Sequence, residues 1–207
     1  MERVASRARV VPLTRDATLV LLAGGRSVRM GRDKATLPVA GGTLVEWIAR
    51  RLGPAFAETI VCGAHVSGAR VVADRHPGAG PLAGMEAGLL AMRTERAFVL
   101  ACDMPRASAA LASLLLDRLG RHDAAVPRVG GVDQPACAAY GRGAASRITA
   151  FLDGGGRRVS ACLATLDVLS VGEGELVEAG IAPDEVADLD TPADYEAFVA
   201  SLRAPRD

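Results

Sequence analysis

Short apolar runs alternate with segments of helical periodicity along most of this chain, and this alternation limits the folds available to it. Residues 18–23 form a compact apolar run followed by two glycines, as expected of a buried strand. Residues 44–52 place Leu44, Ile48 and Leu52 on one face of a helix. Continued through residue 127, the alternation predicts an α/β fold with a mostly parallel sheet that is covered on both faces.

Further elements follow from the same patterns. The expected strands cover residues 59–62, 70–73, 97–102, 123–127, 134–140 and 166–171. The expected helices cover residues 82–92, 108–119, 144–152 and 192–202, with Ser108 and Thr191 as N-terminal caps. The sequence contains no internal repeat and no linker long enough to divide it. We therefore expect a flexible leader over residues 1–17 and a single domain over residues 18–207.

The composition argues against a protein that binds nucleic acid through bulk charge. Half of the residues are apolar, enough for a full hydrophobic core, but only 3% are aromatic, so Ala, Val and Leu must fill most of that core. Lys plus Arg is 24 and Asp plus Glu is 24, which gives a formal net charge of zero. Nucleic-acid binders usually carry a basic excess. A small anionic ligand held by a few well-placed cations remains compatible with this balance.

The cysteines and the N-terminal segment indicate a cytoplasmic protein with no membrane attachment. The four cysteines are widely separated and form no C-x-x-C pair, which argues against a structural zinc site or a redox motif. Each lies in an apolar run, where a free cysteine is usually a small core residue. Reduced thiols fit a cytoplasm best. The first 17 residues contain no apolar segment, so they form neither a signal peptide nor a membrane span.

The segment directly after the first expected strand combines glycines with cations. Gly24 and Gly25 allow a sharp turn and bring backbone N–H groups close to phosphate oxygens. Arg26, Arg29 and Lys34 could then neutralise a triphosphate, although ordinary surface cations are the alternative interpretation. In an open parallel sheet, ligands bind beyond the carboxyl ends of the strands, and this segment is expected there.

Two other glycine motifs do not match this sequence. A Walker A loop needs Gly-Lys followed by Ser or Thr, but Gly31 is followed by arginine. The dinucleotide fingerprint G-x-G-x-x-G is matched only poorly by residues 78–84, which include Pro81. The sequence therefore argues against a nicotinamide-dependent oxidoreductase.

Four acidic residues are further candidates for ligand binding. Asp103 ends an expected strand, where a carboxylate can hold Mg²⁺ at phosphate oxygens or can simply cap the next turn. Asp74 follows a short strand and could accept a hydrogen bond from a nucleotide base or ribose. Asp188 and Asp190 alternate on an extended segment, so only one is expected to face a site, and helix capping is an equal alternative. The sequence offers no obvious nucleophile, which fits phosphoryl-type chemistry by positioning and charge neutralisation.

Three segments, taken in order, carry a resemblance to a known family. Residues 21–34 read L-L-A-G-G-R-S-V-R-M-G-R-D-K, residues 80–89 read G-P-L-A-G-M-E-A-G-L, and residues 101–105 read A-C-D-M-P. With these motifs the chain resembles the molybdenum cofactor guanylyltransferases, roughly from residue 19 to residue 199. The resemblance implies a three-layer, Rossmann-like nucleotidyltransferase fold. It also implies Mg²⁺-dependent transfer of GMP from GTP to molybdopterin, with acceptor molybdoenzymes or cofactor-biosynthesis proteins as further partners.

The same resemblance implies roles for individual residues. Lys34 and Arg29 are expected to spread the charge that develops on the phosphates. Mg²⁺ is expected at Asp103, and Asp190 is a further candidate metal ligand, for a second metal. Gly24 stands in the third place of L-A-G-G, where the wider superfamily carries alanine, and this favours guanine. The residues expected at the nucleotide are Leu22, Ala23, Gly24, Gly25, Lys34, Asp74 and Asp103.

Two departures from the family pattern leave the choice of base and the binding of a second metal open. The family often carries asparagine after the second strand, where this chain has Gly63. The late pattern N-x-N-T-P is replaced here by an acidic pair, Asp188 and Asp190, and acidic residues also occur there in related cytidylyltransferases. One alternative is therefore a nucleotidyltransferase that uses CTP on molybdopterin, or another nucleotide on a sugar or lactyl phosphate. Another is a non-catalytic nucleotide-binding protein of the same fold.

Overall fold

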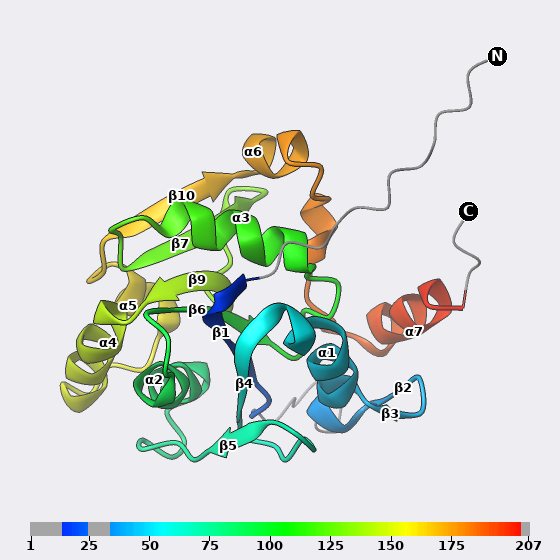
Figure 1. Ribbon diagram of the computed structural model, residues 1–207, viewed down its shortest axis with the longest axis horizontal. Helices are drawn as coiled ribbons and strands as arrows, with labels where there is room; N and C mark the ends of the chain where they lie inside the picture. The colour runs from blue at the N-terminus through cyan, green and yellow to red at the C-terminus, as the bar shows by residue number, and fades with distance from the viewer. Residues whose placement is uncertain (1–13, 25–33, 204–207) are drawn as a thin grey trace.

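The structure is a computed structural model that describes residues 14–24 and 34–203, and it contains one large twisted sheet (Figure 1). The strands of this sheet are β1 (Thr14–Leu22), β4 (Phe56–Cys62), β5 (Arg70–Val72), β6 (Arg96–Ala101), β7 (Ala124–Val129), β8 (Val132–Asp133), β9 (Cys137–Gly141) and β10 (Val168–Gly172). Their order is β10-β7-β9-β6-β1-β4-β5, with β8 paired to β7. Strand β9 runs antiparallel to β6 and β7, and the other pairings along this order are parallel.

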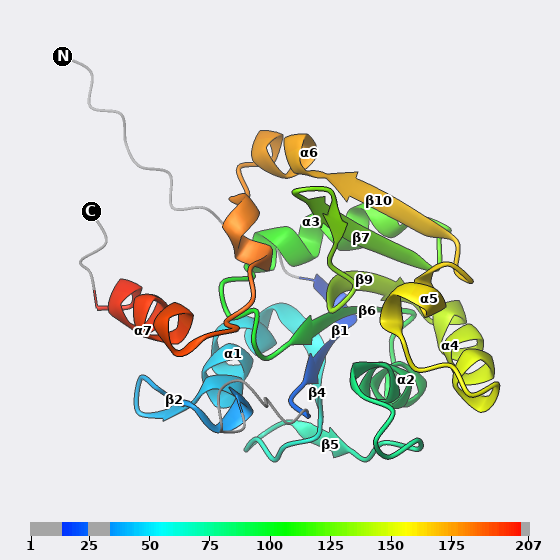
Figure 2. The same cartoon turned by 180° about the vertical axis from the view of Figure 1, so that it is seen from behind.

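Helices cover both faces of the sheet and give the molecule three layers (Figures 1 and 2). The helices are α1 (Leu44–Leu52), α2 (Pro81–Ala91), α3 (Ala109–Leu119), α4 (Gly143–Asp153), α5 (Val159–Leu163), α6 (Glu173–Glu178) and α7 (Pro192–Ser201). Shorter elements are β2 (Pro38–Val39), β3 (Gly42–Thr43), and the 3-10 helices η1 (Lys34–Thr36), η2 (Gly53–Ala55) and η3 (Pro183–Val186). Side chains alternate along β1, so Leu19 and Leu21 join one core cluster and Val20 and Leu22 the other. Helices α1, α3, α6 and α7 contribute to the first cluster, and α2, α4 and α5 to the second.

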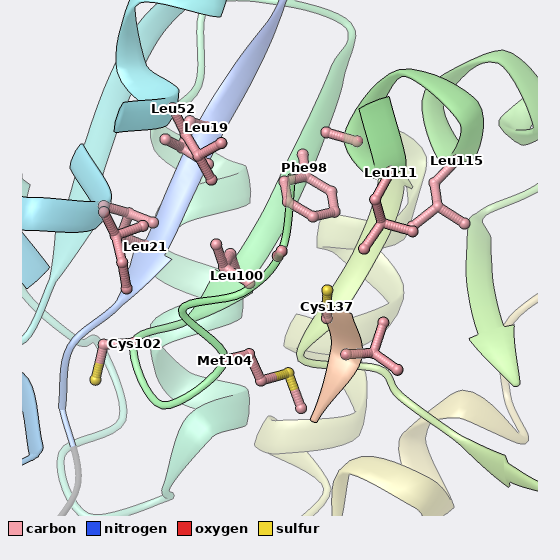
Figure 3. Packing of buried hydrophobic residues seen from close by; sticks show 14 of the residues in the cluster. Leu19, Leu21, Leu52, Phe98, Leu100, Cys102, Met104, Leu111, Leu115 and Cys137 are labelled. Carbon is pink, nitrogen blue, oxygen red and sulfur yellow. The ribbon is translucent and has the colours of Figure 1, made fainter. Parts of the chain in front are cut away.

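The first cluster consists mainly of aliphatic side chains, as the low aromatic content predicts (Figure 3). Phe98 and Leu100 of β6 pack in it with Leu111 and Leu115 of α3, and all four are 0% exposed. Burying a side chain of this size contributes about 1.5–3 kcal/mol to stability. All four cysteines are buried and free, as their apolar surroundings predict.

Helix α2 lies very close to the sheet because two of its residues are glycines. A Cβ atom on Gly88 would lie 2.3 Å from Val20 Cγ1, and one on Gly84 would lie 3.2 Å from Leu22 Cδ2. A larger residue at Gly88 would therefore push α2 away from β1. This close packing brings the first turn of α2 against the end of β1.

The structure confirms the α/β class, the mostly parallel sheet and most expected elements. Helix α1 has the expected bounds, and Ser108 and Thr191 cap α3 and α7 as predicted. Strand β1 begins at Thr14, inside the segment expected as a leader, whose residues 1–13 lie outside the described part of the chain. The hairpin β2–β3 and the antiparallel direction of β9 were not predicted. Among the described residues, no helix has both the length and the apolar character needed to cross a bilayer.

Candidate functional site

The carboxyl ends of four parallel strands lie level with one another. Leu22 of β1 pairs with Cys62 of β4 and with Ala101 of β6, and Cys62 pairs in turn with Val72 of β5. Each strand then enters a loop at the same edge of the sheet. The candidate residues that lie just beyond this row are Gly24, Asp74 and Asp103.

The strand order reverses at this edge. From β1 the chain moves outward through β4 to β5, and then crosses through α2 to β6 on the other side of β1. In open α/β sheets, such a reversal leaves a crevice beyond the strand ends, where ligands bind. Gly24 follows β1 and Asp103 follows β6, so these two residues flank the reversal.

Lys34, at the start of η1, reaches this edge through its side chain. Its Nζ donates to Asp103 Oδ2 at 3.0 Å and to Asp190 Oδ1 at 2.9 Å. The Lys34 side chain is 13% exposed, against 28% for Asp103 and 50% for Asp190, so the carboxylates stay more accessible than the ammonium they enclose. The structure thus brings together three residues predicted from separate motifs, which we call the Lys34 cluster (Lys34, Asp103 and Asp190).

The charges of the Lys34 cluster shift the pKa values of its lysine and of a neighbouring carboxyl. Burial acts to lower the pKa of Lys34, but the hydrogen bonds to Asp190 and Asp103, together with their charges, outweigh it and raise that pKa. Desolvation, followed by the charges of Asp103 and Asp190, raises the pKa of Asp188 to about 6. Lys34 is therefore held protonated in a region of negative potential.

The C-terminal segment delivers Asp190 through backbone contacts. Leu189 is 0% exposed and donates its N–H to the carbonyl oxygen of Asp103 at 2.7 Å. Thr191 then begins α7 with a capping box, in which its hydroxyl accepts from the N–H of Asp194 and the Asp194 carboxylate accepts from the N–H of Thr191. Asp190 is thereby held between a buried leucine and a capped helix start. It is the member of the alternating pair that bonds to Lys34.

The Lys34 cluster offers the oxygen donors that Mg²⁺ prefers. Mg²⁺ is usually held by one or two carboxylates, with substrate phosphates and water as its other ligands. Asp103 and Asp190 supply two carboxylates, each bonded to the same lysine nitrogen. Within residues 14–24 and 34–203, no group of three or more His, Cys, Asp or Glu side chains is arranged to hold a metal ion by itself. The residues present therefore fit a metal that binds together with phosphate.

Gly63 lies against the glycine that follows β1. A Cβ atom on Gly63 would lie 2.6 Å from both the Cα and the N of Gly24, and Gly63 adopts a φ of +95°. Both observations require glycine at this position. The sequence departs from the family's asparagine here, and in this chain the position serves close backbone approach to Gly24.

Asp74 lies at the same edge with one oxygen buried and unbonded. Its Oδ1 has no hydrogen-bond partner within the described part of the chain. A Cβ atom on Gly84 would lie 3.8 Å from this oxygen, and it would also contact Leu22 and Cys62. The Asp74 carboxylate therefore lies beside Gly84 of α2, near the end of β1. Burial, followed by the charge of Glu86, raises the pKa of Asp74.

Of the other residues predicted at the nucleotide, some have buried side chains and the rest lie outside the described part of the chain. The side chains of Leu22 and Ala23 are buried in the core, at 5% and 1% exposure. Leu22 accepts the N–H of Cys102 at its carbonyl, and Ala23 donates its N–H to Cys62. Any contact of these two residues with a nucleotide is thus limited to the remaining backbone groups. Gly25, Arg26 and Arg29 lie outside the described residues.

Arg51 of α1 supports the turn that follows Asp103, a role the sequence did not indicate. Its Nη2 donates to the carbonyl of Pro105 at 2.6 Å and also to the carbonyl of Ala107. Its guanidinium lies 4.5 Å from the ring centre of Trp47. No local pattern could have revealed this contact, because it joins residues more than 50 positions apart.

Comparisons with known proteins identify the family of this chain. A family model described as the MobA-like NTP transferase domain matches residues 19–168. A probable molybdenum cofactor guanylyltransferase of Pelotomaculum thermopropionicum is 41% identical over 132 residues, which cover 61% of this chain and 64% of that protein. A protein of the same description from Natronomonas pharaonis is 33% identical over 194 residues, which cover 87% of this chain and 96% of that protein.

A solved structure supports the fold. The crystal structure of molybdopterin-guanine dinucleotide biosynthesis protein A from Archaeoglobus fulgidus superposes with a TM-score of 0.78. The superposition covers 89% of this chain and 98% of the Archaeoglobus chain, and the two sequences are 23% identical. The edge that carries the Lys34 cluster thus belongs to a fold seen in a nucleotide-cofactor biosynthesis protein. The chain belongs to the MobA-like NTP transferase family and is a nucleotidyltransferase.

Proposed function

We propose that this protein transfers GMP from GTP to a molybdopterin-type acceptor and releases pyrophosphate. The observation that carries the proposal is the Lys34 cluster, which combines one ammonium and two carboxylates at the reversal point of the sheet. Such a set can bind phosphate and a divalent cation together. The description shared by the Pelotomaculum and Natronomonas relatives supports GTP and the molybdenum cofactor as the substrates.

The proposed reaction is an in-line displacement at the α-phosphorus of GTP. A terminal phosphate oxygen of the acceptor forms the new bond to this phosphorus, and the bond to the bridging oxygen of the β-phosphate breaks. The electron pair of that bond leaves with pyrophosphate. Positioning and charge stabilisation supply most of the catalysis in such transfers, so no protein nucleophile is needed.

The chain's own residues provide the positive charge and the orientation. When GTP binds, the Lys34 ammonium donates to its phosphate oxygens, and Arg29 is proposed to do the same from the glycine-rich loop. The backbone at Gly24 lies at the strand end, where an N–H can face phosphate without a side chain between them. Mg²⁺, when bound by Asp103 and Asp190, would neutralise phosphate charge and stabilise the pyrophosphate.

Asp74 is proposed to recognise the nucleoside. Its buried Oδ1 is an acceptor without a partner among the described residues, at the same edge as Gly24. A ribose hydroxyl or a base N–H would satisfy it, and an unsatisfied buried acceptor is costly. In this assignment, the nucleoside binds near the end of β5, and the phosphates bind near the ends of β1 and β6.

The first test is nucleotide binding by calorimetry. GTP, CTP, ATP and UTP are compared with and without Mg²⁺, on the wild type and on Asp103→Ala. We expect a preference for GTP, with the metal-dependent part of the affinity lost in the variant. Turnover is then measured with GTP and molybdopterin as the release of pyrophosphate.

The alternatives make different predictions in the same experiment. A preference for CTP would assign the protein to cytidylyl transfer, which the acidic residue at Asp190 leaves open. GTP binding without pyrophosphate release on any acceptor would indicate a non-catalytic nucleotide-binding protein. If no triphosphate binds, the proposed function is wrong.

A further inference from the structure

Glu86 is the one charged residue that is fully buried among the described residues, and the proposed reaction gives it no role. Its side chain lies in the middle of α2 and is 0% exposed. The carboxylate lies on the face of the sheet that carries the second core cluster, between α2 and α4. A buried ionised group is costly unless it is paired and hydrogen-bonded. The hydrogen-bond partners of Glu86 therefore indicate which groups its carboxylate fixes in place.

Three side chains converge on a single oxygen of Glu86. The hydroxyl of Thr149 on α4 donates to Oε1 at 2.7 Å, and Nη1 of Arg75 donates to it at 3.2 Å. Nε2 of His76 lies 3.5 Å from the same oxygen, and also 3.5 Å from Oδ1 of Asp153 on α4. This nitrogen and Oε2 of Glu86 make no hydrogen bond within the described residues. Two of the three partners, Arg75 and His76, come directly after Asp74.

The segment that carries Asp74 has little support from the backbone. Residues 73–80 are described, and they form no helix or strand between the short edge strand β5 and α2. Within this segment, a backbone hydrogen bond joins the N–H of Ala79 to the carbonyl of His76. The hydrogen bond from Arg75 to Glu86 thus attaches an irregular segment to α2, and the His76 ring lies against the same carboxylate.

Stability alone does not explain a carboxylate at this position. Replacing a buried ion pair with a well-packed apolar residue is often neutral or stabilising. Arg75 is 57% exposed, so it could remain hydrated without Glu86. A buried carboxylate with directional partners instead fixes one arrangement of the groups bonded to it.

We propose that Glu86 is a positioning residue for nucleotide recognition. By bonding Arg75, with His76 beside it, Glu86 fixes the segment after β5 so that the Asp74 carboxylate stays at the end of β1. Gly84, two residues before Glu86 on the same helix, lies beside this carboxylate, since a Cβ atom on it would be 3.8 Å from Asp74 Oδ1. The inference rests on the proposed function, in which Asp74 binds the nucleoside.

The test is a double-mutant cycle between Glu86 and Asp74, read by calorimetry with GTP and Mg²⁺. Glu86→Gln keeps the shape and removes the charge, and we expect it to weaken GTP binding by about tenfold, a typical coupling between interacting residues. The KM for GTP should rise by the same factor while kcat stays within about twofold, because the phosphate-binding residues are unchanged. Asp74→Asn should also weaken binding. The double variant should bind GTP no more weakly than Asp74→Asn, because Glu86 acts through Asp74.

Two further variants separate positioning from general stability. Glu86→Leu should bind GTP as weakly as Glu86→Gln, because an apolar side chain of similar size is kept while the hydrogen-bond acceptor for Arg75 is lost. Asp123→Asn is the matched control. Asp123 is a 13% exposed carboxylate bonded to Arg147 and to the N–H of Asp167, at the start of β7. Its loss should leave GTP affinity unchanged.

Different experimental results would contradict the inference and the proposed function. If Asp74→Asn weakens GTP binding but Glu86→Gln and Glu86→Leu do not, Glu86 has no positioning role and the proposed function stands. Additive losses in the double variant would show that Glu86 acts independently of Asp74, which also overturns the inference. If Asp74→Asn itself binds GTP normally, the assignment of Asp74 is wrong and the inference falls with it.

Discussion

The Lys34 ammonium lies between the carboxylates of Asp103 and Asp190, the position that the proposed function gives to a divalent cation. A lysine and a metal ion cannot both occupy that position, because like charges at such distances repel strongly. Triphosphate offers the ammonium other acceptors. The geometry therefore predicts that Lys34 and the metal compete in the absence of nucleotide and bind together in its presence.

Lys34→Met tests this competition directly. Without nucleotide, the variant should bind Mn²⁺ about tenfold more tightly (~1.4 kcal/mol), a fraction of the ~4 kcal/mol between two unit charges about 4 Å apart near a protein surface. With both substrates, its kcat should fall by about 10²–10³-fold, because a donor to the phosphates is lost. Calorimetric Mn²⁺ titration and pyrophosphate release measure the two effects.

The control for Lys34→Met keeps the positive charge. Lys34→Arg should bind Mn²⁺ without nucleotide as weakly as the wild type does. If Lys34→Met bound Mn²⁺ no more tightly than the wild type, the ammonium would not be a competitor. Normal turnover in Lys34→Met would show that the lysine has no catalytic role.

Gly63 supports a second prediction for a single residue. Gly63→Ala should destabilise the fold by about 2 kcal/mol or more, through the positive φ and the clash with Gly24. GTP binding should weaken as well, because the new methyl group displaces the Gly24 backbone, which the proposed function places against phosphate. Urea unfolding and calorimetry measure the two quantities.

Gly68→Ala is the matched control for Gly63→Ala. Gly68 lies in the same connection and has a φ of +80°, but a Cβ atom there would contact nothing within 4 Å. It should therefore lose only the roughly 1 kcal/mol of an unfavourable φ and keep full GTP affinity. Equal losses in the two variants would mean that contact with Gly24 is unimportant.

The residue candidates were predictable where a local motif carried them. Lys34, Asp74 and Asp103 follow expected strands within recognisable segments, and the structure places all three at one edge. The sequence left Asp188 and Asp190 undecided, because the choice depends on how the C-terminal segment crosses the sheet. Glu86 lay within a quoted motif, yet its role depends on Arg75 and Thr149, which local patterns do not connect to it.

At the scale of elements, α1 supports the turn that follows Asp103 through Arg51. We expect Arg51→Ala to lower stability by about 1–3 kcal/mol, because two backbone carbonyls lose a charged donor. Mn²⁺ affinity in the presence of GTP should fall with it, since the turn after Asp103 is no longer fixed. Urea unfolding and Mn²⁺ titration measure these changes.

Arg50→Ala is the control on the same helix. Arg50 is also in the last turn of α1, but its guanidinium lies beside Gly42 and Glu46 rather than at the turn after Asp103. Its loss should leave Mn²⁺ affinity unchanged. If Arg51→Ala lost stability but kept full Mn²⁺ affinity, its contact would be structural only.

Elements with a strong local sequence pattern were predicted well, whereas elements defined mainly by strand pairing were not. Helix α1 has a regular apolar face and the capping residue Thr43, and its observed bounds match the expected ones. The strands β2, β3 and β8 contain two residues each, too few for any periodicity. The direction of β9 depends on its partners β6 and β7, which residues 137–141 alone do not specify.

At the scale of the whole molecule, the C-terminal segment supplies Asp190 to a site whose other residues come from the first half of the chain. After β10 and α6 at one end of the sheet, it passes η3 and returns beside α1, as Figure 2 shows for α7. Tyr195 Oη donates to the carbonyl of Pro38 at 2.5 Å, and Phe198 packs edge-on against Trp47 at 5.3 Å. This docking holds Asp190 opposite Lys34. No local pattern predicts it, because it joins elements more than 150 residues apart.

Phe198→Ala tests whether docking of α7 and metal binding are coupled. Phe198 is 2% exposed, so its truncation should lower stability by about 3–5 kcal/mol if the site stays packed, and less if α7 detaches. Detachment should also weaken Mn²⁺ binding with GTP and change the fluorescence of Trp47, the single tryptophan. Val177→Ala, at a 57% exposed position on α6, should change none of these. If Phe198→Ala unfolds more easily yet binds Mn²⁺ as the wild type does, the backbone contact between Leu189 and Asp103 is sufficient to hold Asp190 in place.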